Sequence, residues 1–319
     1  MKLFGYDNLH FDENSLHEFH KLNESLFIRL LFQNLEDVMG EEFNEYDFFI
    51  YSNFKGDTYP VSISYNSKRK KVLLYFSDES GSDPSPYVRD YYAVFKAYIG
   101  TSVKFDNVFP LPLGYVKDVP QLPIIPTKER KFNVFFRGNL NNNRIDFYRN
   151  FSKWKPILPS QTFLKERLWN KTTKYRALLL KLRTDFSDYF PDSIIMFNSS
   201  FKTGFSPYEY GEFLADSKIV LCPKGFDMTE CFRHFEAMRA GCVIISEKLP
   251  ETEFYKNSPI IQIEDWGKGL AIAKNLIDDL DTMAGIQQKT IKWWEEKCSE
   301  KGTAAYIYRK LQTLVPHVV

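Results

Sequence analysis

Short apolar, aromatic-rich runs alternate along this chain with longer segments of helical periodicity, and this pattern constrains the fold more than any other feature. Such an alternation is typical of α/β architecture with parallel strands. The predicted strands are residues 2–6, 47–53, 71–77, 92–99, 107–113, 131–139, 193–200, 218–225, 242–246 and 259–266. The predicted helices are residues 14–38, 141–151, 165–183, 207–217, 229–241 and a long region from Gly267.

One segment interrupts the alternation. Residues 116–130, VKDVPQLPIIPTKER, contain three prolines and no hydrophobic period, as a linker does. The chain has 319 residues, more than the roughly 100–200 of a usual single domain. We therefore predict an N-terminal domain of residues 1–120 and a C-terminal domain of residues 121–319, with the C-terminal helix packing back on the first domain.

The charge changes sign at this linker. The net charge of +1 argues against a dedicated nucleic-acid binder. Residues 1–120 carry 12 Lys/Arg and 18 Asp/Glu (−6), whereas residues 121–319 carry 30 and 23 (+7). A basic second domain predicts an anionic ligand or surface, although two domains that complement each other across a cleft would show the same asymmetry.

The four cysteines indicate a reducing compartment. Cys222, Cys231, Cys242 and Cys298 form no CxxC pair and have no Cys/His spacing of a zinc site. The N-terminus turns polar after four residues, and no window approaches the roughly 18 apolar residues of a membrane span. We expect a cytoplasmic protein with no signal peptide, no transmembrane helix and no metal site.

Residues 218–246 are the most informative stretch. They predict a strand (KIVLC), a loop (PKGFDM), a helix with an N-cap at Thr229 and a C′ glycine at Gly241, and a second buried strand (CVIIS). In such a unit the loop and the helix N-terminus lie at the carboxyl edge of the sheet, where free N–H groups attract anions. Lys224 and Arg233 add cations for a diphosphate, and Glu236, one turn further, can accept hydrogen bonds from ribose hydroxyls.

The run LCPKG…CFRHFEAMRAGCVII resembles the C-terminal signature of exostosin-like glycosyltransferases, and VFFRGN at 134–139 is similar to a motif at the start of that family's nucleotide-binding domain. The strong part of the resemblance lies in the second domain. The loop after Gly225 departs from the family's pattern, and Glu230 and Cys231 stand where smaller residues are usual.

The resemblance implies a GT-B fold, in which two Rossmann-like domains face each other across a cleft and the second holds most of the nucleotide-sugar. It implies that Arg137, Arg144, Lys224 and Arg233 neutralise the donor diphosphate and that Glu236 holds the ribose. Gly225 and Glu230 belong to the same donor loop. The resemblance also implies transfer that inverts the anomeric centre and needs no bound metal, with the arginines and a helix N-terminus stabilising the leaving phosphate.

An inverting transfer needs a general base, expected from the first domain across the cleft. Asp78 and Glu79 directly follow an apolar run, which places them at the carboxyl end of a buried strand. An acidic strand tip of this kind is similar to that of fucosyltransferase-type GT-B enzymes. We rank the two acids equally as the base.

The sequence thus predicts an inverting glycosyltransferase that transfers a sugar from a nucleoside diphosphate, with UDP preferred, to a glycan or lipid-linked oligosaccharide. The alternatives are a GDP-sugar-using, fucosyltransferase-like enzyme and a non-catalytic glycan-binding protein. Residues 165–183 are rich in Lys and Arg and suit either peripheral contact with an anionic inner-membrane face or an ordinary solvent-exposed helix.

Overall fold

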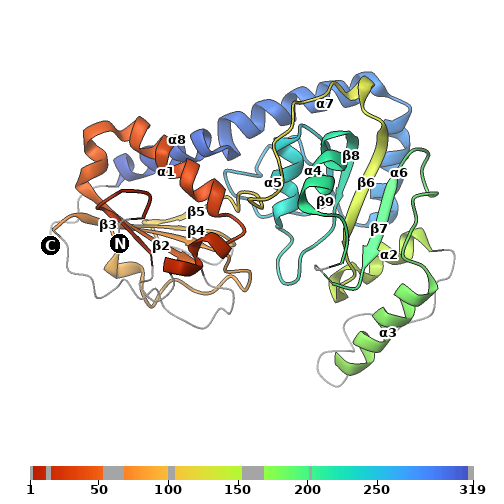
Figure 1. The fold of residues 1–319 in the computed structure, drawn as a ribbon, viewed down its shortest axis with the longest axis horizontal. Coiled ribbons are helices and arrows are strands. Elements are labelled where there is room, and N and C mark those ends of the chain that lie inside the picture. Colours follow the sequence, from red (N-terminus) through yellow and green to blue (C-terminus); the bar gives the residue numbers. More distant parts are fainter. Residues whose placement is uncertain are drawn as a thin grey trace.

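The protein, represented by a computed structural model, contains two parallel five-stranded sheets covered by helices and loops (Figure 1). The structure describes residues 3–11, 16–52, 68–99, 105–152, 169–200 and 203–314. All strand pairings within the sheets of this described part are parallel. The predicted α/β class with parallel strands is therefore confirmed.

The first sheet uses its strands in chain order, β1-β2-β3-β4-β5. They are β1 (Leu9–Phe11), β2 (Tyr46–Ser52), β3 (Lys70–Phe76), β4 (Ala93–Lys96) and β5 (Val108–Pro110). Side chains of β2 alternate between two cores: Phe48 and Ile50 face the helices, whereas Phe49 and Tyr51 join an aromatic cluster on the other side. Burial on both faces explains why these strands are continuous apolar runs in the sequence.

Two helices from opposite ends of the chain cover one face of this sheet. α1 (Ser25–Met39) and α8 (Glu300–Thr313) lie side by side (Figure 1). α1 ends at Gly40, whose φ of 57° is a left-handed conformation that glycine adopts at little cost. The rings of Tyr306 on α8 and Phe95 on β4 are 6.1 Å apart, so the C-terminal helix packs into the core of the first domain.

The second sheet has the order β10-β9-β8-β6-β7, which is not the chain order. Its strands are β6 (Phe132–Asn139), β7 (Ile194–Asn198), β8 (Ser217–Cys222), β9 (Val243–Glu247) and β10 (Ile261–Ile263). The chain leaves β6 to one side to form β7 and then returns to the other side of β6 to form β8. We call the carboxyl ends of β6 and β8 the switch point of this sheet, because connections diverge there and open a crevice.

Helices pack around the second sheet. They are α2 (Ile145–Phe151), α3 (Trp169–Leu182), α4 (Pro207–Ala215), α5 (Phe232–Arg239), α6 (Trp266–Ile277) and α7 (Leu280–Trp293). α4 begins with a capping box between Ser206 and Glu209. α3 projects away from the sheet at the far end of the molecule (Figure 1).

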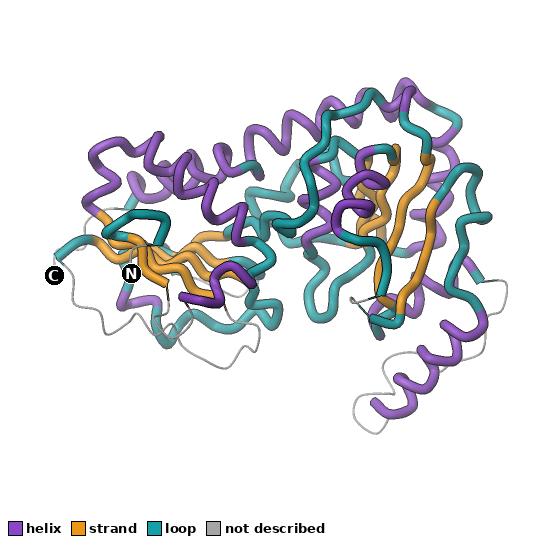
Figure 2. Tube along the Cα trace, in the orientation of Figure 1, coloured by secondary structure: helices purple, strands orange, loops and turns teal. Residues whose placement is uncertain are grey.

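Two connections join the domains. Residues 111–131 run from β5 to β6 mainly as loop (Figure 2), and Arg130 in this segment donates hydrogen bonds to the carbonyls of Ser217 and Ala240. In the other direction, a π-helical turn at Trp294–Cys298 leads from α7 into α8. One apolar core extends from α1 and α8 to α5, so both domains share it and their facing edges are held together.

Three element boundaries differ from those predicted. Leu3 and Tyr6 form only an isolated bridge, and the first strand is β1. Residues 14 and 15 of the predicted helix 14–38 lie outside the described part of the chain, and the rest consists of a short 3-10 helix, Leu16–Lys21, followed by α1. α5 begins at Phe232 and not near Thr229, because the backbone of Cys231 is extended and serves as the N-cap. Of the predicted basic helix, residues 165–168 lie outside the described part of the chain.

Candidate active site

A cavity of about 640 Å³ lies between the two domains. Its first wall is the carboxyl edge of the N-terminal sheet and the start of α1, represented by Asn23, Ser77, Glu79 and Tyr98. Its second wall is the switch point of the C-terminal sheet, the first turn of α5 and the loop that leads into α4. Residues far apart in sequence therefore meet here because parallel strands of each sheet end at one edge.

Two arginines converge on the switch point. The Arg144 side chain is held by backbone: Nε donates to the Lys224 carbonyl (2.9 Å) and Nη1 to the Asn139 carbonyl (3.0 Å). Arg233, in the first turn of α5, donates from Nη2 to the Arg137 carbonyl (2.6 Å). Nε and Nη1 of Arg233 are shielded from solvent and have no partner of normal hydrogen-bond geometry among the described residues. These donors are available to an anion.

The two cations also repel each other. Burial, followed by the positive charge of Arg233, lowers the pKa of Arg144 to about 10. Like charges in a low-dielectric site are unfavourable unless an anion lies between them or close to both. The N-terminus of α5 adds partial positive charge at the same place. The arrangement therefore suits a phosphate or diphosphate.

Glycines allow this close approach. A Cβ atom at Gly138 would lie 2.8 Å from Nη2 of Arg233 and 3.2 Å from Nη1 of Arg144. A Cβ atom at Gly225 would lie 2.9 Å from the Met228 carbonyl oxygen and 3.0 Å from Oε1 of Glu79. Real Cβ atoms do not come so close to their neighbours, so neither position accommodates a side chain without movement. Of these, Gly225 was predicted at the site and Gly138 was not.

Glu236 lies in the cavity wall as predicted from its spacing on α5. Its Oε1 accepts a hydrogen bond from the Val116 amide (3.3 Å), and its side chain also bonds to Tyr210. Burial raises the pKa of Glu236 to about 7, although the Val116 amide and Arg233 oppose the shift. Its carboxylate can accept hydrogen bonds from hydroxyl groups of a ligand.

Arg137 lines the cavity on the side of β7. Its guanidinium carbon lies 4.6 Å from the centre of the Phe205 ring, and Nη1 is 3.2 Å from the Met196 sulfur. Its Nε is buried without a hydrogen-bond partner in the described part of the protein. Stacking on Phe205 fixes the plane of the guanidinium group beside the crevice.

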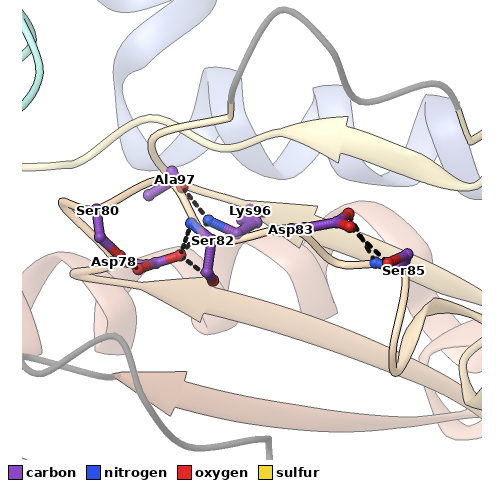
Figure 3. Close-up of polar contacts among 7 residues, drawn as sticks. All are labelled: Asp78, Ser80, Ser82, Asp83, Ser85, Lys96 and Ala97. Atoms are coloured by element: carbon purple, nitrogen blue, oxygen red, sulfur yellow. Dashed lines mark hydrogen bonds and ion pairs between the residues drawn. The ribbon is translucent and has the colours of Figure 1, made fainter.

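Asp78, one of the two acids predicted as the base, does not line the cavity and is bound within the first domain (Figure 3). Its side chain is 0% exposed and accepts hydrogen bonds from Nζ of Lys96 (2.5 Å), Oγ of Ser80 (2.7 Å) and the amide of Ser82 (2.8 Å). Burial raises its pKa, but the bonds from Lys96 and the two serines outweigh burial and hold the pKa below its usual value. This carboxylate is a poor proton acceptor.

Glu79, the other predicted acid, does line the cavity. Its Oε1 accepts a hydrogen bond from the Phe226 amide (2.9 Å), which lies across the cavity in the loop after β8. Adjacent side chains at the end of β3 therefore face different environments: Asp78 points into the first domain and Glu79 toward the second. This alternation separates two residues that the sequence left equal.

Two predicted donor-binding residues lie outside the cavity. Glu230 is buried at the seam between the domains, where it lies near Tyr255, and burial raises its pKa to about 7. Lys224 contributes its carbonyl to Arg144, but its side chain is not part of the cavity wall. Both residues flank the loop after β8, which is closed by a hydrogen bond from the Gly225 amide to the Met228 carbonyl.

Other cavity residues were missed from the sequence. Ser77 and Tyr98 follow the last residues of β3 and β4, and Tyr210 lies on α4. The signal for Ser77 was present, because it is the last residue of a predicted strand. Within the described residues, no three His, Cys, Asp or Glu side chains come together as a metal site, and no helix is long and apolar enough to cross a membrane.

Comparison with solved structures identifies the architecture. HepE of Anabaena, solved in complex with UDP and glucose, matches over 91% of this chain and 82% of its own, with 12% identity and a TM-score of 0.51. The chain has the GT-B fold. The predicted fold class is thus confirmed, with the cavity in the cleft between the two GT-B domains.

Other matches are weaker. TarM of S. aureus is 13% identical with a TM-score of 0.48, and the chain covers about half of it (83% of this chain, 55% of TarM). A glycosyltransferase from Rickettsia africae is 10% identical with a TM-score of 0.48 over 90% of this chain and 82% of its own. No protein-family model and no curated protein sequence matches the chain. The resemblance to exostosin-like enzymes therefore stays a prediction.

Proposed function

We propose that this GT-B protein is an inverting, metal-independent glycosyltransferase that transfers a sugar from a nucleoside diphosphate, UDP in our proposal, to a hydroxyl of a surface glycan or polysaccharide acceptor. The observation that carries the proposal is the pair Arg144 and Arg233 at the switch point, because two cations that line one cavity, one of them with unpartnered donors, call for a polyanion. HepE, which has the same fold, is described with UDP and glucose.

In this proposal the donor occupies the C-terminal wall. Arg144 and Arg233 neutralise the diphosphate, Arg137 assists from β6, and Glu236 accepts hydrogen bonds from the ribose. Gly225 allows the loop to approach the donor. Lys224 and Glu230, predicted for the same task, act at most on the shape of this loop.

For this reaction the protein mainly has to stabilise the charge of the leaving group and position the acceptor and the donor. The acceptor oxygen attacks the anomeric carbon from the face opposite the phosphate, the C–O bond to the phosphate breaks, and its electron pair goes to the leaving diphosphate. Arg233 and the N-terminus of α5 stabilise that charge without a metal ion. Glu79 takes the acceptor proton, since of Asp78 and Glu79 it is the one in the cavity wall.

We keep the peripheral-membrane proposal for the segment 165–183 and a cytoplasmic location. In its described part, α3, Lys174 and Lys181 are exposed together with Leu178 and Leu182. Such a surface can rest on anionic lipid. Sedimentation with vesicles of neutral and of anionic lipid, with and without Lys174→Glu/Lys181→Glu, tests this; equal binding to both vesicle types contradicts it.

A nucleotide panel tests the main proposal. We expect UDP to raise the melting temperature and to bind in calorimetry, and Arg233→Ala and Glu236→Ala to weaken that binding. Unchanged UDP affinity in both variants would refute the donor site. Stabilisation by GDP in place of UDP would favour the fucosyltransferase-like alternative, and no stabilisation by UDP, GDP, CMP or dTDP would favour a non-catalytic protein.

A screen of sugar nucleotides then names the donor. We expect one of them to release its nucleotide slowly with water as acceptor. Glu79→Gln should lower this rate and leave UDP affinity unchanged, whereas Asp78→Asn should act through stability. A Glu79→Gln protein with wild-type turnover would remove Glu79 as the base.

A further inference from the structure

Two residues at the N-terminal wall of the cavity have an unusual backbone. Ser77 and Tyr98 directly follow the end regions of β3 and β4, and both line the cavity. Their φ angles, 56° and 53°, are left-handed conformations that non-glycine residues rarely adopt. Such strain persists where the surrounding structure holds it, often at functional sites. Glycine would suit position 77 better, so the serine hydroxyl needs a reason.

That hydroxyl is bound to a buried acid. Oγ of Ser77 donates to Oε1 of Glu24 at 2.5 Å, and Glu24 stands just before the first residue of α1. The Glu24 side chain is 1% exposed, and its Oε2 has no hydrogen-bond partner among the residues described. Burial raises the pKa of Glu24 against the opposing bond from Ser77. A buried carboxyl with one unsatisfied oxygen costs stability.

The hydrogen bond between Ser77 and Glu24 is not explained by packing. One residue further along the chain, beyond the end of β3, the Asp78 carboxylate is fully bonded by Lys96, Ser80 and Ser82, as a structural acid should be. Among the residues that the structure describes, Glu24 has one side-chain hydrogen-bond partner, Ser77, which lines the cavity. The strained backbone of Ser77 and the incompletely bonded carboxyl group of Glu24 thus lie together on the acceptor side of the cleft.

The hydrogen bond fixes what Ser77 can do. A serine hydroxyl has one proton and two lone pairs, and here the proton is given to Glu24. With Glu24 ionised, the oxygen can therefore only accept a hydrogen bond from the cavity. Glu79, two residues along the chain, lines the same wall. A ligand with two neighbouring hydroxyl groups can place one near Glu79 and donate from the other to Ser77.

We propose that Ser77, held in orientation by Glu24, binds a second hydroxyl of the acceptor next to the one that reacts, so that the site selects polyhydroxyl acceptors. This inference rests on the proposed transferase function. Ser77 is the binding residue and Glu24 a positioning residue. No proton leaves the acceptor through this pair.

The test separates transfer to water from transfer to sugar. Nucleotide release from the sugar nucleotide found in the screen is measured with water alone, and product formation is measured with methyl pyranosides or with methanol as acceptor. We expect Ser77→Gly, which removes the hydroxyl without adding strain, to lower transfer to the pyranosides about tenfold by loss of one hydrogen bond. UDP affinity, which depends on the C-terminal wall, should stay at its wild-type value, and transfer to methanol, which has no second hydroxyl, should fall much less than transfer to the pyranosides.

Glu24→Gln is the second variant. Its amide can donate to Oγ of Ser77, which occupies one lone pair of that oxygen and lets the serine proton point into the cavity, where it opposes an incoming hydroxyl donor. We expect a similar loss of pyranoside transfer, seen as a raised KM for the pyranoside, and no further loss in the double variant, because both changes remove one interaction. Retained UDP affinity shows that each variant is folded.

A matched control exists on the same domain. Oγ of Ser85 donates to Asp83 at 2.5 Å, a serine–carboxylate bond of the same length on the exposed surface (Figure 3). Ser85→Gly should change neither reaction. Unchanged pyranoside transfer in Ser77→Gly and Glu24→Gln, or a wild-type protein that does not prefer pyranosides to methanol, overturns the inference. Absence of any nucleotide release by the wild type contradicts the proposed function instead.

Discussion

The molecule buries charge in two opposite ways at the two edges of its cleft. In the N-terminal domain, Asp78 and Lys96 form an ion pair in which both side chains are 0% exposed, and serine and backbone groups complete their bonding. In the C-terminal domain, Arg144 and Arg233 are two like charges brought together, and Arg233 keeps donors without partners in the described structure.

This difference separates charges that stabilise the fold from charges that form the binding site. We call Asp78 and Lys96 the closed pair, because their opposite charges neutralise each other and need no ligand. This ion pair fixes the end of β3 and the loop that follows. We call Arg144 and Arg233 the open pair. These two cations are unfavourable on their own and are stabilised when an anion binds. The same reasoning separates Asp78 from Glu79, although they are adjacent in sequence.

Breaking the closed pair should have the largest effect. Lys96→Met leaves the buried Asp78 carboxylate without its cation, and we expect the free energy of unfolding to fall by about 3–5 kcal/mol. Urea denaturation measures this loss, and UDP affinity of the folded fraction should be unchanged. The double variant Asp78→Asn/Lys96→Met should recover much of the stability. If Lys96→Met alone is as stable as the wild type, the pair is not a structural element.

Removing one cation of the open pair should lower ligand affinity and leave the free energy of unfolding unchanged. Arg233→Ala removes the cation with free donors and relieves its repulsion with Arg144, so we expect unfolding to be unchanged while UDP affinity falls about 100-fold. Calorimetry measures the affinity. Arg183→Ala, which removes an exposed arginine paired with Asp188, is the control and should bind UDP normally. A large loss of stability in Arg233→Ala would assign that residue to the scaffold.

Two buried glutamates offer a matched comparison of pH dependence. Burial raises the pKa of both Glu230 and Glu236 to about 7 from the ordinary 4.5, but only Glu236 lines the cavity. A raised folded-state pKa means that the stability contribution of each is complete below pH 4.5 and is lost as pH rises through about 7.

We therefore expect Glu230→Gln and Glu236→Gln each to increase stability more at pH 8 than at pH 5, as thermal unfolding at the two values will show. Only Glu236→Gln should weaken UDP binding, by about tenfold, because only it removes a carboxylate from the cavity. Equal UDP affinity in both variants would remove the ribose-binding role of Glu236.

The fold was largely predictable from sequence because it depends on pattern. Two-sided burial of parallel strands produces apolar runs such as 71–77 and 218–225, and Gly241, with a φ of 65°, marks the end of α5 as its sequence position indicated. Boundaries failed where backbone geometry decided them, as at Cys231, whose extended backbone starts α5 later than the capping pattern suggested.

The site was predictable only where helical spacing fixes direction. Arg233 and Glu236, three residues apart on α5, both reach the cavity, as the spacing required. Lys224 and Glu230 lie in loop and cap positions, where neighbouring turns and not periodicity set the side-chain direction. Glu24 and Ser77 are 53 residues apart and meet only through the tertiary fold, so no local pattern could pair them.

The smallest effect is expected at Gly138, the glycine that lies against the two arginines of the open pair. In Gly138→Ala the new methyl group would lie 2.8 Å from Nη2 of Arg233, so the guanidinium group must shift by a few tenths of an ångström. We expect UDP affinity to fall by on the order of 1 kcal/mol, with a similar or smaller loss of stability. Gly285→Ala on α7 is the control, because nothing lies within 4 Å of the added methyl group and alanine favours the helix. Since the two substitutions add the same atom, weaker UDP binding in Gly138→Ala alone would show that the arginines need this close approach, whereas equal affinity would show that they can rearrange around it.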